Sequence, residues 1–248
     1  MPRPRDSRQG NPVPEEDVAA MFDSIAPVYD RVNTLMTAGG DGRWRNAAAD
    51  ATGLGTGGAV VDVACGTGKL SATLADRVGP FGRVVGVDLA PAMVAAAAAA
   101  YGDLVQLTFQ VGNALALPFA DADFDAATIA FGLRNLADFE AGFRELARVV
   151  KPGGRVVCLE LTVPPQRGWG RLFRSSFGRL APLVASAFGQ GQAYRYLPSS
   201  LDGFPDAPTL VDTMRAAGLV EVGFRRLALG AVALHVGRAP AAGRPPGA

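Results

Sequence analysis

The stretch VVDVACGTG at residues 60–68 decides the fold. Its first half is a short apolar run next to glycines, which is typical of a buried strand. The glycine turn that follows opens residues 70–78, whose apolar side chains recur at helical spacing up to Gly79. A helix that begins at such a turn has free backbone N–H groups, and glycine lets a ligand approach them closely. Taken alone, the pattern is also compatible with an ordinary tight turn between a strand and a helix.

An acidic residue after the next predicted strand makes the turn more specific. Asp88 lies 20 residues after Gly68 and directly follows the predicted strand at residues 83–87 (RVVGV). A carboxylate there can accept hydrogen bonds from both hydroxyls of a ribose, so the two signals together indicate a nucleoside cofactor. Ser71 replaces the third glycine of a dinucleotide fingerprint, and the lysine pattern of a phosphate-binding loop is absent. A cofactor without phosphates, S-adenosylmethionine (SAM), is therefore favoured, and a Rossmann dehydrogenase is the alternative.

Apolar runs alternate with helical patterns along the rest of the chain. The predicted strands are residues 59–64, 83–87, 107–111, 124–130, 155–161, 221–227 and 231–238, and the predicted helices are 70–78, 91–100, 139–150 and 209–217. Strands that alternate with helices form right-handed βαβ units around a parallel sheet. The last two strands form a hairpin with a tight turn near Gly230, which makes one strand antiparallel. We therefore predict a Rossmann-like, doubly wound α/β fold with seven strands and helices on both faces.

Composition suggests the domain boundaries. Residues 1–16 and 239–248 are rich in proline, arginine and glycine and are predicted to be disordered tails. Residues 17–238 then form one domain, in which about 162–208 are an insertion that covers the substrate. Of the 248 residues 49% are hydrophobic and 19% charged, which suits a globular core, and the net charge of +1 gives no field that would recruit nucleic acid.

Several classes of protein are disfavoured by what the sequence lacks. Cys65 and Cys158 lie far apart and His235 is the single histidine, so neither a disulfide framework nor a metal site is expected. The first residues, MPRPRDSRQG, lack the apolar core of a signal peptide, and no run of about 18 strongly apolar residues occurs. The sequence has no stripe of basic residues with interleaved aromatic residues, so nucleic-acid binding is not expected. The expected location is the cytoplasm.

Longer motifs resemble those of one family. They are MFDSIA at 21–26, YD at 29–30, ALPF at 116–119, FGLRN at 131–135, KPGG at 151–154, YRYL at 194–197, FPD at 204–206 and VALH at 232–235. Together they resemble the ubiquinone/menaquinone biosynthesis C-methyltransferases, especially the demethylmenaquinone methyltransferases, over residues 21–237. The glycine turn and KPGG are common to class I SAM-dependent methyltransferases. FGLRN and YRYL are much narrower, and they carry the resemblance.

The resemblance implies a set of cofactor contacts, and this chain departs from the family at some of them. Ala130 stands where the family has a serine, which leaves a backbone contact only. Lys69 replaces an acidic residue, whose contact with the methionine amino group Asp62 could take over. Asn113 is placed to read the adenine edge, with the capping of a turn as the alternative. The predicted cofactor-binding residues are Asp62, Gly66, Thr67, Gly68, Asp88, Asn113, Ala114 and Ala130.

A second group of residues is predicted on the substrate side. Arg134 and Asn135 follow the strand at 124–130, at the carboxyl edge where doubly wound folds place ligands. We expect Arg134 to stabilise a phenolate and Asn135 to orient it, with four further side chains closing the pocket. Packing alone is the alternative for Tyr29, and a structural role is favoured for His235 over that of a base. The predicted catalytic residues are Arg134, Asn135, Tyr29, Asp30, Tyr194 and Arg195, where Arg195 could instead only hold Asp30.

Two further segments bear on substrate and partners. The element GDGRWR at 40–45 lacks the histidine of the Gly-x-His-Arg-x-Trp-Lys pattern in the family that the chain resembles. Residues 169–189, read as a helix, have an apolar face and a cluster of arginines. Such a segment can rest on an anionic membrane, where prenylated quinones reside, or simply cover the active site. The enzyme could accordingly lie at the inner face of the cell membrane. It could also form a homodimer.

The predicted function is methyl transfer from SAM to a ring carbon of a prenylated quinol. Conversion of demethylmenaquinol to menaquinol is favoured over a substrate of the ubiquinone series. Two alternatives stay open. The chain could methylate another small aromatic or secondary metabolite, because Lys69 and Asp41 depart from the family pattern. It could also bind SAM without catalysis, although the intact FGLRN motif argues against this.

Overall fold

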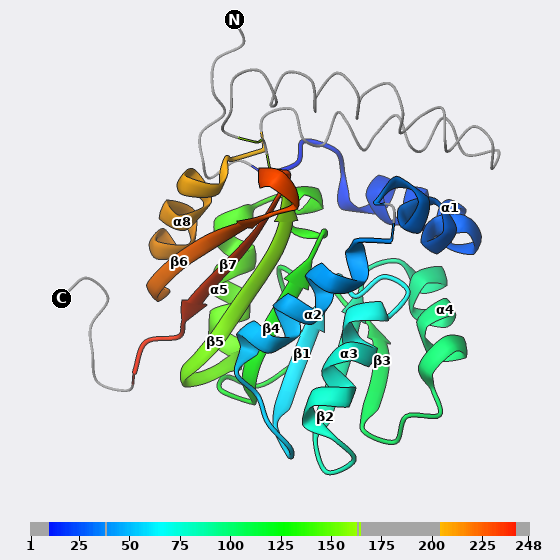
Figure 1. Cartoon of the computed structure of the whole chain (residues 1–248), viewed down its shortest axis with the longest axis horizontal. Coiled ribbons are helices and arrows are strands. Elements are labelled where there is room, and N and C mark those ends of the chain that lie inside the picture. Colours follow the sequence, from blue (N-terminus) through cyan, green and yellow to red (C-terminus); the bar gives the residue numbers. More distant parts are fainter. Residues whose placement is uncertain (1–9, 38, 163, 165–203, 242–248) are drawn as a thin grey trace, which may run out of the picture.

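Figure 1 shows the computed structural model of the chain, which describes residues 10–37, 39–162, 164 and 204–241. The elements in chain order are α1 (Glu15–Met36), α2 (Asp41–Thr52), β1 (Ala59–Val63), α3 (Lys69–Val78), β2 (Arg83–Asp88), α4 (Pro91–Tyr101), β3 (Leu107–Val111), β4 (Phe124–Ala130), the 3₁₀ turn η1 (Leu133–Asn135), α5 (Phe139–Val149), β5 (Val150–Leu161), α8 (Ala207–Ala216), β6 (Val220–Leu227), the 3₁₀ turn η3 (Ala228–Gly230) and β7 (Val232–Arg238).

The seven strands form one sheet in the order β3-β2-β1-β4-β5-β7-β6. β7 pairs antiparallel with β5 and β6, and the other pairings are parallel. The predicted fold and its single antiparallel strand are therefore confirmed. The chain order reverses between β1 and β4. In open α/β sheets the ligand crevice lies at such a reversal, beyond the carboxyl ends of the strands.

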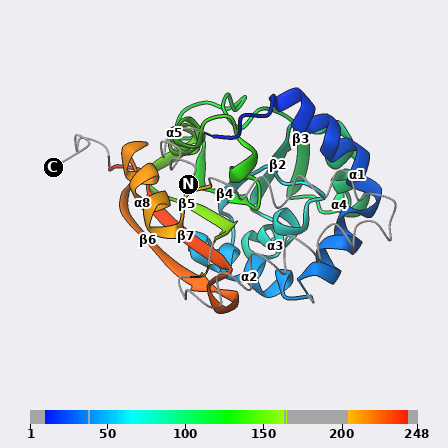
Figure 2. The same ribbon diagram turned by 90° about the horizontal axis from the view of Figure 1, so that it is seen from above.

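Alternate residues of the central strands are buried on opposite faces of the sheet. Val60 packs with Leu74 of α3 on one face, whereas Val61 packs with Phe143 of α5 and Met214 of α8 on the other. Figure 2, seen from above, shows the sheet between these two layers of helices. Both valines are inaccessible to solvent, and each such side chain contributes roughly 1.5–3 kcal/mol to folding through its removal from water.

Helix α1 lies outside these layers, next to α4 at one end of the sheet (Figure 1). Asp23 of α1 accepts a hydrogen bond of 2.8 Å from the backbone N–H of Ala92, in the first turn of α4. This satisfies one of the free N–H groups at the start of that helix. Ile25 and Val32 of α1 pack in a cluster with Met93 of α4. The helix is therefore fixed beside the ligand crevice.

Two elements differ from the prediction. The sequence pattern did not predict α2. The apolar side chains that this helix buries are those of Ala48 and Ala49, which are too small to give a clear helical pattern. β5 begins at Val150 and not at residue 155, because the KPGG motif, which resembles a stop, continues the strand through an irregularity. The pairing with β4 shifts there between Phe124 and Ala126.

Short parts of both predicted tails are packed in the structure. The backbone N–H of Asn11 donates to the carbonyl of Leu136, and α1 already begins at Glu15. At the other end Ala239 is buried and donates to the carbonyl of Gly154. The predicted tail boundaries at 16 and 239 are therefore wrong for these residues, because backbone pairing that composition does not reveal holds them in place.

Candidate functional site

The glycine turn after β1 has a backbone that side chains would obstruct. Gly66 and Gly68 have φ values of +55° and +82°, in the left-handed region that favours glycine. A Cβ at Gly68 would lie 2.8 Å from the ring of Phe109. The N–H of Gly66 donates to a carboxylate oxygen of Asp88 over 2.7 Å. The turn and the acid of β2 are thus one unit, as the sequence spacing predicted.

Asp88 ends β2 with its carboxylate at the wall of a cavity. Its second oxygen accepts a hydrogen bond of 3.0 Å from the N–H of Ala90. Burial raises the pKa of this carboxyl, and the hydrogen bonds from the backbone N–H groups oppose the rise. An ionised carboxylate offers about four acceptor positions. Asp88 therefore keeps acceptor capacity for a ligand after it has bonded the turn.

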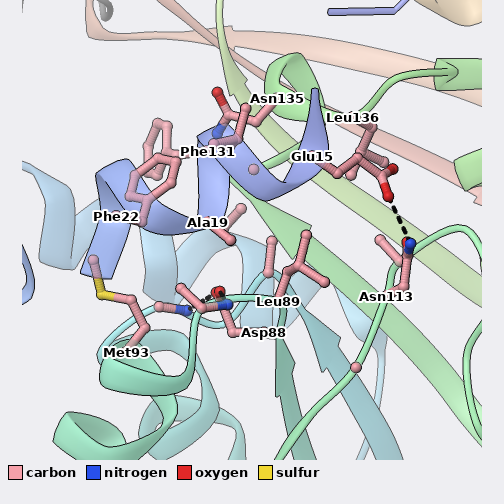
Figure 3. Close-up of a pocket in the computed structure, with 18 of the residues that line it drawn as sticks. Glu15, Ala19, Phe22, Asp88, Leu89, Met93, Asn113, Phe131, Asn135 and Leu136 are labelled. Carbon is pink, nitrogen blue, oxygen red and sulfur yellow. Dashed lines mark hydrogen bonds between the residues drawn. The ribbon is translucent and has the colours of Figure 1, made fainter. Parts of the chain in front are cut away.

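The cavity beside Asp88 encloses about 710 Å³ of empty space, its open mouth included. Figure 3 shows α1 passing over it, with Glu15, Ala19 and Phe22 opposite the strand ends. Glu15 accepts a hydrogen bond of 2.7 Å from the side-chain amide of Asn113. The described residues that line this cofactor cavity are Glu15, Val18, Ala19, Phe22, Tyr29, Ala64, Gly66, Asp88, Leu89, Ala90, Met93, Gly112, Asn113, Ala114, Ala130, Phe131, Gly132, Asn135 and Leu136.

The chemistry of this wall fits SAM. Glu15 and Asp88 are carboxylates, and no lysine or arginine stands among the described residues that line the cavity. A pyrophosphate would lack a cationic partner there, whereas the cationic sulfonium of SAM suits an acidic wall. Leu89, Met93 and Ala114 provide apolar surface for an adenine. Asp88 supplies the acceptor for the ribose hydroxyls.

A second cavity of about 760 Å³, its mouth included, adjoins the first. Tyr29 and Phe131 line both cavities, so they stand at the junction. The described residues that line this substrate cavity are Tyr29, Asn33, Met36, Thr37, Asp41, Trp44, Arg45, Phe131, Arg134, Leu161, Ala231 and Val232. Its walls combine large apolar side chains with two arginines and one carboxylate, which suits an aromatic ligand that carries oxygen atoms.

The FGLRN motif builds the junction between the two cavities. Phe131 has φ +58°, a strained conformation for a side chain of this size. A Cβ at Gly132 would lie 2.4 Å from that of Ala64, so only glycine fits. Arg134 is 4% exposed and forms a 2.5 Å ion pair with Glu160, while its Nη1 also donates to the carbonyl of Phe131 over 2.7 Å. The motif therefore fixes the position of the Phe131 ring.

Arg134 and Asn135 lie on different sides of this junction. Arg134 lines the substrate cavity, whereas Asn135 lines the cofactor cavity. Tyr29 faces both cavities. Burial raises the pKa of Tyr29 and outweighs the lowering by Arg134 and Arg45, so the side chain is a neutral phenol at neutral pH. Tyr29 can pack and donate a hydrogen bond there, but it does not supply a base.

Two predicted residues of the glycine turn, Thr67 and Gly68, line neither cavity, and the same holds for Asp30 of α1. Thr67 donates a hydrogen bond of 2.8 Å to Asp30 of α1, and Lys69 lies 3.4 Å from the same carboxylate oxygen. Asp30 therefore binds the turn and not the substrate cavity for which it was predicted. Gly68 lies so close to the ring of Phe109 that a side chain would not fit there. Among the predicted cofactor-binding residues, Gly66, Asp88, Asn113, Ala114 and Ala130 reach the cofactor cavity.

Asp62 is buried between β1, β4 and α3 and does not reach the cofactor cavity. Its two oxygens accept hydrogen bonds from Ser71 over 2.7 Å and from Thr128 over 2.6 Å, and it is 1% exposed. Asp62 is therefore not placed to contact the methionine amino group of SAM, as had been expected. Burial raises the pKa of Asp62 to about 6, although both hydroxyl hydrogen bonds lower it.

The raised pKa of Asp62 predicts a pH dependence of stability. The folded protein binds the proton more tightly than the unfolded chain, so stability falls as pH rises from about 4 to about 6. A rise of about two pKa units corresponds to about 3 kcal/mol. We expect urea unfolding of wild type to lose up to this amount relative to Asp62→Asn across that range. Parallel pH profiles of the two proteins would contradict the assignment.

Two predicted residues and one segment lie outside the described part of the chain. They are Tyr194, Arg195 and residues 169–189. His235 is described and lies in β7, where its Nε2 is 2.9 Å from the carbonyl of Ala207 and its ring stacks on Phe224. Burial lowers the pKa of His235. It lines neither cavity, so the structural role favoured from the sequence agrees with its position.

The sequence reasoning missed functional side chains on α1 and α2. Glu15 was assigned to a tail, although acidic residues in the first turn of a helix are common because they interact favourably with its N-terminus. Asp41, Trp44 and Arg45 line the substrate cavity. Their i, i+3 and i, i+4 spacing places them on one helical face, and this was the signal available.

The described residues contain neither a group of side chains that could hold a metal ion nor a helix of the length and hydropathy that a membrane span requires.

Comparison with known proteins identifies the family. The model of the ubiE/COQ5 methyltransferase family matches residues 11–239. A demethylmenaquinone methyltransferase from Thermus thermophilus is 44% identical over 89% of this chain and 100% of its own length. Another from Mycolicibacterium paratuberculosis is 41% identical over 90% and 94%, and the ubiquinone/menaquinone biosynthesis C-methyltransferase UbiE of Geobacter sulfurreducens is 37% identical over 90% and 88%.

Solved structures support the fold. The [4+2]-cyclase SpnF superposes with a TM-score of 0.70 at 21% identity, over 94% of this chain and 100% of its own. A SAM-dependent methyltransferase from Aquifex aeolicus gives 0.57 at 20%, over 77% and 86%. Since a cyclase shares this architecture, the activity follows from the family match and not from the fold. The chain belongs to the ubiE/COQ5 methyltransferase family and is an enzyme that takes its methyl group from SAM.

Proposed function

We propose that the enzyme methylates a ring carbon of a prenylated quinol, and that demethylmenaquinol is its substrate. The observation that carries the proposal is the pair of adjoining cavities that share Tyr29 and Phe131. One has the acidic wall that suits SAM, and the other has the apolar and cationic wall that suits a hydroxylated aromatic ring. The names of the relatives at 44% and 41% identity support the menaquinone series.

In this mechanism the protein supplies alignment, exclusion of water and charge. Bound SAM offers a methyl group on a positively charged sulfur, which is electrophilic. Gly66, Asp88 and Asn113 line the cavity and would hold its nucleoside, and α1 passes over this cavity. Tyr29 and Phe131 position the substrate ring at the junction and keep water from it. A ring carbon becomes nucleophilic when the neighbouring hydroxyl loses its proton, and positive charge in the wall of the substrate cavity stabilises the resulting oxyanion.

A labelling experiment tests the substrate. Purified enzyme is incubated without oxygen with methyl-labelled SAM and reduced demethylmenaquinone, and the extracted quinone is analysed for label. We expect label on the ring of menaquinone, and slower transfer to a demethylated benzoquinol of the ubiquinone series. If SAM binds but neither quinol is labelled, the substrate proposal is wrong, and a screen of other small aromatic compounds follows.

Three statements about the surroundings of the enzyme stay predictions from the sequence. They are the cytoplasmic location, the contact of residues 169–189 with an anionic membrane surface, and the homodimer. Sedimentation of the enzyme with vesicles of anionic lipid, and its mass in solution, test the last two.

A further inference from the structure

Arg45 is a cation in the substrate cavity with unused hydrogen-bonding capacity. Its side chain is 14% exposed, and its Nε is buried without a hydrogen-bond partner among the described residues. Its closest ion pair, Nη2 to Asp41, is long at 3.4 Å. The guanidinium lies 5.7 Å from the centre of the Phe131 ring, at the junction of the two cavities. A buried N–H without a partner is costly, so the position favours a ligand oxygen.

Asp41 is the carboxylate beside it. Its side chain is 9% exposed, and in the described part of the chain it accepts two hydrogen bonds, of 3.4 Å from Arg45 and of 3.3 Å from the hydroxyl of Thr37. Both are at the long limit for a hydrogen bond, whereas a carboxylate can accept about four. Asp41 and Arg45 are four residues apart on α2, so they share one face of the helix. A base and an oxyanion partner are therefore adjacent in the cavity wall.

The other titratable groups near the substrate cavity are already engaged. Arg134 is paired with Glu160, which also accepts hydrogen bonds from the backbone N–H groups of Arg134 and Leu161. Tyr29 is a neutral phenol, because burial raises its pKa. Of the acidic side chains that are described, Asp41 alone lines this cavity.

We propose that Asp41 is the general base of the reaction and that Arg45 binds the oxyanion that it creates, an inference that rests on the proposed quinol substrate. The ring hydroxyl loses its proton to Asp41, and the negative charge stays on the ring oxygen beside Arg45. As the bond between the ring carbon and the methyl group forms, the bond from that methyl group to the sulfur of SAM would break, with its electron pair returning to sulfur to leave a neutral thioether. The ring carbon then carries the new methyl group and its original hydrogen. That hydrogen leaves as a proton to solvent, which restores the aromatic ring, and the oxygen takes its proton back from Asp41.

The test compares Asp41→Asn with Asp50→Asn, which removes an exposed carboxylate of the same helix. With labelled SAM and reduced demethylmenaquinone, we expect kcat of Asp41→Asn to fall about 10²–10⁴-fold, the usual contribution of a general base. The dissociation constant for SAM, measured by calorimetry, should stay within about threefold of wild type. Asp50→Asn should retain wild-type turnover.

The pH profile separates a base from a structural residue. Between pH 6 and 8.5 the rate of Asp41→Asn should rise about tenfold per pH unit, because only substrate that is already ionised reacts and a phenol ionises near pH 10. The wild-type rate should change little over this range, because the base takes the proton from the neutral hydroxyl. A wild-type profile in Asp41→Asn overturns the proposal. If wild type itself labels no quinol, the proposed function is wrong instead.

Arg45→Gln provides the second arm, with Arg43→Gln, an exposed arginine of the same helix, as its control. We expect kcat of Arg45→Gln to fall about 10²–10³-fold, as for loss of one oxyanion donor. Arg45→Lys should recover part of the rate, because it restores the charge without the planar fork. Unchanged turnover in Arg45→Gln overturns the proposal. This arm therefore tests the proposal even if Asp41→Asn does not fold.

Discussion

Replacing Asp88 with alanine is expected to weaken SAM binding by about 10²–10⁴-fold. A hydrogen bond to a charged group contributes about 1.5–3 kcal/mol, and the carboxylate is placed to accept two from a ribose. The same oxygens accept from the N–H groups of Gly66 and Ala90, so the substitution also loosens the glycine turn. Calorimetric titration with SAM measures the affinity, and thermal unfolding measures the accompanying loss of stability.

Two further variants make this measurement specific. Asp88→Asn keeps an acceptor oxygen and is expected to lose affinity to an intermediate degree. Asp76→Ala removes an exposed carboxylate from α3 and should bind SAM like wild type. If Asp88→Ala is folded and its dissociation constant lies within threefold of wild type, the cavity beside β2 is not the cofactor site.

Local patterns sufficed for much of the fold. The bounds predicted for β3 and β4 agree with the structure to the residue, because each is an apolar run that ends at polar or glycine-rich sequence. α2 was missed because its helix buries mainly small side chains, which give little periodicity. β5 was cut short because Gly153 has φ +80° and the motif around it resembles a turn. Its pairing with β4 is a tertiary contact that the sequence does not display.

The site could be predicted where its residues belong to one supersecondary unit. The glycine turn and Asp88 belong to consecutive parts of one βαβ unit, so their spacing determines their contact. Asp62 illustrates the limit, since alternation along β1 turns it to the same face as Val60, toward α3, and away from the cavity. Asp41 and Arg45 reach the substrate cavity only because α2 packs against α3, β4 and β5, and no local pattern specifies that tertiary contact.

The roles of Arg134 and Glu160 lead to the second large effect, on stability. Glu160→Gln removes the carboxylate that forms the ion pair with the buried guanidinium of Arg134, a residue that is 4% exposed. Breaking a buried ion pair in this way costs about 3–5 kcal/mol of unfolding free energy. Asp212→Asn breaks an exposed pair with Arg215 and should cost no more than about 1 kcal/mol. Urea unfolding of the two variants and wild type measures the difference.

A double substitution separates the charge from the position of the residue. In Arg134→Leu/Glu160→Leu both charges of the buried ion pair are removed together, so we expect the double variant to recover most of the stability that Glu160→Gln loses. It still lacks the hydrogen bond from Arg134 to the carbonyl of Phe131, whose backbone is strained at φ +58°. Phe131 should therefore lose its fixed position at the junction, and turnover with quinol should fall although SAM still binds. Wild-type turnover in a stable double variant would show that neither the charge of Arg134 nor its hold on Phe131 is needed for the reaction.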